Sequence, residues 1–86
     1  MNVVSISEIQ RLDLAVQYRR AYHGTVKTEI GGTTRSNRIE FALELTALGT
    51  NDITVRFLES PEFPVVPATE VISAAIRKLD QDGGLP

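Results

Sequence analysis

The sequence contains no cysteine among its 86 residues. This absence excludes disulfide bonds, thiolate catalysis and zinc sites built from cysteine, and it fits a cytoplasmic location. No apolar run approaches the roughly 18 residues that a membrane-spanning helix requires. The first ten residues, MNVVSISEIQ, have neither a basic start nor a long apolar segment, so we expect no secretory signal in them.

Residue patterns that carry catalysis or bind cofactors are also missing. His23 is the only histidine, so a metal site there would have to recruit carboxylates from elsewhere in the chain. The segment Gly31–Asn37 has two adjacent glycines. It lacks the Lys-Ser/Thr of a P-loop and the spaced glycines of a dinucleotide-binding turn. We therefore expect no catalytic, cofactor-binding or metal-binding residues, and no enzyme activity.

Net charge is small but unevenly distributed along the chain. The formal net charge is −2. Residues 1–43 hold six basic against four acidic residues, and residues 44–86 hold three against seven. One interpretation is simple scatter. The other is two electrostatically distinct faces, which would steer a partner or a second copy of the chain.

The length and composition correspond to one small folded unit. We expect residues 1–86 to form a single domain. Apolar residues make up 42% of the chain, which is typical of a globular protein and too high for a disordered one. A chain of this size buries only about 60–65% of its unfolded surface, so its core is small.

The segment Arg38–Glu59 predicts a β-hairpin. Its apolar residues alternate with polar ones on both sides of the turn Gly49–Asn51, as the two strands of a half-buried hairpin require. The apolar positions are Ile39, Phe41, Leu43, Leu45, Ile53, Val55 and Phe57. Our predicted register sets Leu43 opposite Phe57 on the inward face and Glu44 opposite Arg56 on the outward face.

The N-terminal third predicts a helix followed by a strand. Ser7 and Gln10 fit a capping box, and Gly24 is a natural helix stop, so we expect a helix from about Ser7 to Tyr22. This helix would carry two apolar stripes on roughly opposite sides, one formed by Ile9, Leu12 and Val16 and the other by Leu14, Tyr18 and Ala21.

A strand is predicted at Thr25–Ile30, with Gly31–Asn37 as the loop that follows it. Two registers against the next strand remain open. The preferred one sets Lys27 opposite Glu40, and the other sets Lys27 opposite Glu44.

The C-terminal third predicts an extended connection and a second helix. Three prolines in Ser60–Pro67 exclude both a helix and a central strand there. This connection either closes the core with Phe63 or exposes an apolar ridge to a partner. The apolar period then predicts an amphipathic helix over about Pro67–Asp80, ended by Gly83-Gly84 through a left-handed cap.

The predicted fold class is therefore α+β, with the order α-β-β-β-α. It consists of a three-stranded antiparallel meander with two helices packed on one face. This order resembles that of double-stranded-RNA-binding domains and the small toxin fold related to them. Members of the first group carry a lysine cluster at the start of the last helix, where this chain reads Pro67-Ala68-Thr69-Glu70.

The function expected from the sequence is a non-catalytic interaction module that binds a second copy of itself or another protein. The candidate interface consists of Leu14, Tyr18, Leu58 and Phe63, and a homodimer would use the Leu14/Tyr18 stripe or the edge of the last strand. The alternative is a nucleic-acid-binding domain that uses a basic patch in the N-terminal half. The candidate patch residues are Arg19, Arg20, Lys27, Arg35 and Arg38.

Overall fold

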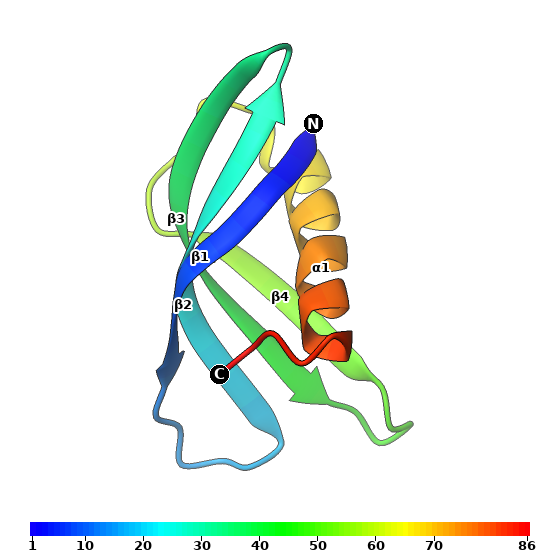
Figure 1. Cartoon of the computed structure of the whole chain (residues 1–86). Helices are drawn as coiled ribbons and strands as arrows, with labels where there is room; N and C mark the ends of the chain where they lie inside the picture. Colours follow the sequence, from blue (N-terminus) through cyan, green and yellow to red (C-terminus); the bar gives the residue numbers. More distant parts are fainter.

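The computed structural model describes residues 1–86 as one four-stranded antiparallel sheet and one helix (Figure 1). The strands lie in the sheet in chain order, and the helix covers one face, which we call the helix face. The opposite face is left uncovered and is called the outer face. The elements are β1 (Asn2–Leu12), β2 (Arg19–Ile30), β3 (Thr33–Leu45), β4 (Asn51–Phe57) and α1 (Val65–Gln81).

The predicted order α-β-β-β-α is wrong, because the segment Ser7–Tyr22 forms no helix. Its first part belongs to β1 and its last part to β2, so the sheet has four strands and a single C-terminal helix covers it. The resemblance to double-stranded-RNA-binding domains depended on the predicted order and is lost with it.

Two irregularities in the β1–β2 pairing explain the helix-like pattern of β1. Each one adds a residue to β1, as a β-bulge does. Val3, Ile6 and Ile9 therefore all pack against the core although they are three residues apart. A spacing of three residues is close to the helical period, which is why the sequence predicted a helix.

The predicted strand Thr25–Ile30 is the second half of the longer β2. Gly24 lies within that strand, opposite Ile39, and ends no helix. Gly31 and Gly32 have φ values of 56° and 80°, as in the two-residue turns that demand positive φ at both central positions. The loop predicted to continue to Asn37 is therefore a tight turn, and β3 begins at Thr33.

The predicted hairpin exists, but its register is wrong by four residues. Leu43 pairs with Ile53 instead of Phe57, and Arg56 pairs with Glu40 instead of Glu44. The connection between the strands is longer than predicted: the Thr46 N–H donates to the Thr50 carbonyl at 2.8 Å. A shift by an even number of residues preserves the faces, so the inward and outward assignments of these side chains remain correct.

Both registers considered for β2 and β3 are also wrong. Lys27 pairs with Ser36, and its predicted partner Glu40 lies opposite His23. The β2–β3 pairing is unbroken over twelve residue pairs, from Arg19 with Glu44 to Ile30 with Thr33. The tight glycine turn fixes this register, because it leaves no slack between the strands.

The core lies between the helix face and α1. The rings of Tyr22 and Phe41 stack with their centroids 5.1 Å apart. The Tyr22 hydroxyl donates to the Pro86 carbonyl oxygen at 3.1 Å, which satisfies the polar group of a fully buried ring. The buried core cluster consists of Tyr22, Val26, Ile39, Phe41, Leu43, Ile72 and Ile76.

The predicted C-terminal helix is confirmed and begins two residues earlier than expected, at Val65. Ala68, Ile72 and Ile76 are its buried residues, and all three belong to the predicted apolar side. Gly83 has a φ of 73°, and its N–H donates to the Asp80 carbonyl at 3.1 Å. The helix therefore ends in the expected left-handed conformation.

Two leucine substitutions test the assignment of the core. Leu43 is 1% exposed, whereas Leu48 in the β3–β4 loop is 91% exposed. Leu43→Ala should lower the free energy of unfolding by about 2–5 kcal/mol, because it leaves a cavity under α1. Leu48→Ala is the matched control and should change it by less than about 0.5 kcal/mol. Urea titration measures both values, and equal costs would contradict the burial of Leu43.

Candidate interaction surfaces

The four residues of the sequence-predicted interface lie at three separate places. Leu14 and Tyr18 lie in the β1–β2 loop, where both are exposed. Leu58 follows β4 directly and is exposed near Arg38, whose carbonyl accepts its N–H. Phe63 is half-buried, and its ring meets Phe57 edge-on at 5.6 Å. Phe63 therefore closes the end of the core instead of forming an exposed ridge.

Leu14 and Tyr18 belong to a larger exposed cluster at one end of the sheet. The β1–β2 and β3–β4 loops lie together at this end (Figure 1). They are joined where the Leu45 N–H donates to the Tyr18 carbonyl at 2.8 Å. We call the cluster the apolar end, and its members are Leu14, Val16, Tyr18, Leu45 and Leu48. Exposed apolar groups gathered in this way are typical of a contact site.

Substitution at Leu14 tests whether the apolar end contributes to the fold. Its side chain is 43% exposed in a loop, so Leu14→Glu places a charge in water and not in the core. We expect the thermal unfolding midpoint to stay within a few degrees of the original, since a small surface effect shifts it little. Unfolding of this variant at room temperature would show that Leu14 is a core residue.

The candidate basic residues do not converge on one patch. Arg20 faces α1, where its guanidinium donates to Asp80 at 3.0 Å, and this hydrogen bond raises the pKa of Arg20. Arg35 forms an ion pair with Glu62 in the connection before α1. The other three, Arg19, Lys27 and Arg38, lie exposed on the outer face at different levels of the sheet.

A row of charged side chains crosses the outer face through Glu40. One carboxylate oxygen of Glu40 lies 3.1 Å from Nε2 of His23 on β2, and the other accepts from Arg56 on β4 at 2.9 Å. The hydrogen bond from Arg56, followed by that from His23, lowers the pKa of Glu40. No hydroxyl or thiol nucleophile is bonded to His23, and no group of three acidic or histidine side chains is placed to hold a metal ion. The row therefore ties three strands together.

Acid should abolish the contribution of this row to stability. Because folding lowers the pKa of Glu40, its ionised form stabilises the fold above the ordinary glutamate pKa. This contribution is lost as the pH falls through the lowered value. The side chain is 30% exposed, so Glu40→Gln should cost at most about 1 kcal/mol at neutral pH. Urea titrations at neutral and acidic pH should show the two proteins converging in acid. A constant difference would contradict this role.

The two edge strands of the sheet differ in regularity. Strand β1 contains both pairing irregularities, and Glu8 within it has a φ of 52°. Such bulges and twists protect an edge from pairing with another chain. Strand β4 has an unbroken register against β3 and contains neither proline nor lysine. The sheet therefore has one protected edge and one open edge.

The hydrogen-bonding pattern of β3 and β4 shows which backbone groups form this open edge. Thr46 donates to Thr50, and the Leu58 N–H donates to Arg38. Hydrogen-bonded pairs alternate with non-bonded pairs in an antiparallel ladder, so the even-numbered residues of β4 point their backbone groups at β3. The outward-pointing backbone groups are those of Ile53, Val55 and Phe57, with Asn51, whose carbonyl accepts from Arg77 at 3.3 Å.

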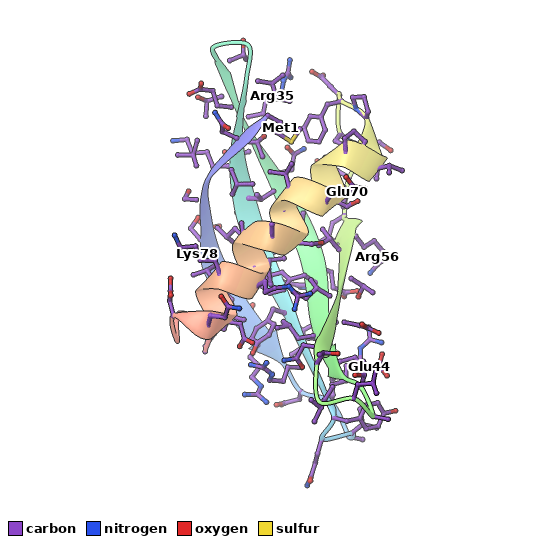
Figure 2. All side chains as sticks on the ribbon, turned by 90° about the vertical axis from the view of Figure 1, so that its right-hand side faces the viewer. Met1, Arg35, Glu44, Arg56, Glu70 and Lys78 are labelled. Carbon is purple, nitrogen blue, oxygen red and sulfur yellow. The ribbon has the colours of Figure 1, made fainter.

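An apolar groove lies on the other side of the molecule, between β1 and α1. It has a volume of about 380 Å³ and is lined by Val3, Val4 and Ile6 on the strand and Ala75 and Leu79 on the helix. In Figure 2, α1 faces the viewer with Lys78 beside this groove and β4 on the far side of the helix. The groove and the open edge are therefore separate surfaces.

The strand order and these surfaces define a small antiparallel α+β domain with an uncovered sheet face and an open edge. The chain belongs to the protein family whose model matches residues 1–81, which is nearly its whole length. No curated protein and no solved structure matches it. Helix α1 lacks the combination of length and apolar character needed to cross a membrane.

Proposed function

We propose that this chain is a non-catalytic interaction module that associates with a second copy of itself through the open edge of β4. The observation that carries the proposal is the contrast between the irregular β1 and the regular β4. A regular exposed edge offers a row of unpaired backbone donors and acceptors to another strand. The absence of cysteine supports a cytoplasmic location as part of the same proposal.

The side chains of β4 support the choice of this edge. Ile53, Val55 and Phe57 are half-buried on the helix face although α1 packs beside them. A strand added to the edge would cover part of the apolar surface that these side chains still expose. A small domain gains from such pairing because so much of its surface remains open to water.

Nucleic-acid binding receives less support from the arrangement of the outer face. Arg19, Lys27 and Arg38 are interspersed there with Glu29 and Glu44, so no continuous positive surface forms. The phenylalanine and tyrosine rings of β2, β3 and β4 all lie on the helix face. The outer face therefore offers none of these rings for a base to stack on.

Sedimentation velocity of the unmodified chain, from low to high micromolar concentration, tests the proposal. We expect the mass to rise from monomer to dimer with concentration. Val55→Pro should give a folded monomer, because the Val55 N–H points out of the edge and takes no part in the β3 ladder. Thr54→Pro should unfold the domain, because the Thr54 N–H donates to β3.

Leu14→Glu separates the two candidate surfaces. This variant should dimerise like the unmodified chain, since the apolar end lies apart from the edge of β4. Loss of association in Leu14→Glu but not in Val55→Pro would assign self-association to the apolar end. A monomer at all concentrations of the unmodified chain would contradict self-association altogether.

A further inference from the structure

The charges of β4 are arranged so that the strand is complementary to itself. Asp52 and Arg56 lie on the outer face, two residues before and two residues after Thr54. Asp52 is paired with Glu44 on β3, a like charge directly across the ladder, and it takes part in none of the ion pairs of the chain. Arg56 bonds Glu40 on one side, and its side chain remains 69% exposed. Asp52 thus lacks a cation that a neighbouring strand would supply.

We propose that two copies pair β4 with β4 antiparallel, centred on Thr54, so that Asp52 of each copy faces Arg56 of the other. This inference rests on the proposed self-association and specifies its register. Opposite charges directly across an antiparallel ladder stabilise the pairing, and this arrangement forms two such pairs by symmetry. The pairing also gives Asp52 a cation on the side away from Glu44.

The backbone supports the same register independently of the charges. Centring on Thr54 sets Ile53 of one copy opposite Val55 of the other, and these are residues whose N–H and C=O groups point out of the edge. They therefore form hydrogen-bonded pairs, while the two Thr54 residues form a non-bonded pair on the two-fold axis. A shift of one copy by a single residue would set outward-pointing groups against inward-pointing ones and lose these bonds.

The resulting dimer has one continuous sheet with both helices on the same face. Figure 2 shows Arg56 on the side of β4 that faces away from α1, where a second sheet would join. The Arg77 guanidinium bonds the Asn51 carbonyl at one end of the edge. The paired stretch is therefore centred on residues 53–55, and Arg77 limits its extension towards Asn51.

Complementary charge reversals test this register. Asp52→Arg alone sets two arginines against each other at both symmetric positions, and Arg56→Asp alone sets two aspartates against each other. Each variant should dimerise roughly tenfold more weakly or worse than the unmodified chain. An equimolar mixture of the two variants should recover the dimer, because each mixed pair then avoids one of the two like-charge contacts and the arginine-rich strand faces the aspartate-rich one. Asp82→Arg, an exposed reversal on the β1 side, is the matched control and should dimerise normally.

Cysteine cross-linking provides a second readout that does not depend on charge. The chain has no native cysteine, so Thr54→Cys introduces a single thiol. In a non-bonded antiparallel pair the two Cα atoms lie about 4.5 Å apart, within the range that a disulfide spans. Mild oxidation should convert this variant to a covalent dimer that retains its circular dichroism spectrum. Thr34→Cys, exposed on β3, is the control and should remain monomeric in non-reducing electrophoresis.

The outcomes distinguish this inference from the proposed function on which it rests. If the unmodified chain dimerises but neither reversal weakens the dimer and Thr54→Cys does not cross-link, the register is wrong and self-association stands. If the reversals weaken the dimer but their mixture does not restore it, the two charges are not paired across the axis and the register is also wrong. A monomeric unmodified chain overturns the proposed function itself.

Discussion

The pairing of β2 with β3 is the interaction on which the rest of the structure depends. Its twelve consecutive residue pairs form the centre of the sheet, with β1 added outside β2 and β4 added outside β3. The core ring pair also belongs to it, since Tyr22 and Phe41 lie directly opposite each other on these strands. Helix α1 then buries Ile72 and Ile76 on this centre. Without the hairpin neither edge strand nor helix would have a surface on which to pack.

The sequence predicted those elements whose period matches their local geometry. The alternation in β3 and β4 and the 3.6-residue pattern of α1 arise from unbroken strands and an unbroken helix, so both were read correctly. In β1 each bulge inserts one residue, and the inward side chains recur every third residue instead of every second. No local signal in the sequence distinguishes that spacing from the stripe of a helix.

The pairing partners of the strands were less accessible than their faces. Candidate charge pairs such as Glu44 with Arg56 and Lys27 with Glu40 favoured registers that the structure does not have. Exposed ion pairs contribute little energy, whereas turn geometry and ring packing fix the alignment. The site residues followed the same rule: Leu14 and Tyr18 were assigned to an exposed apolar surface, but the cluster became visible only when the sheet brought Leu45 beside Tyr18. The open edge of β4 required the complete strand order.

The simple up-and-down order of the strands has a consequence for how the chain reaches its native state. Every strand pairs only with its neighbours in sequence, so the sheet can grow outwards from the Gly31-Gly32 turn without closing a long loop. The entropy cost of loop closure is therefore small at each step, and only the docking of α1 and the Tyr22–Pro86 contact join distant parts of the chain. Low contact order of this kind is associated with rapid folding. It also shortens the time for which the unpaired edge of β4 stays exposed alongside an unfinished core.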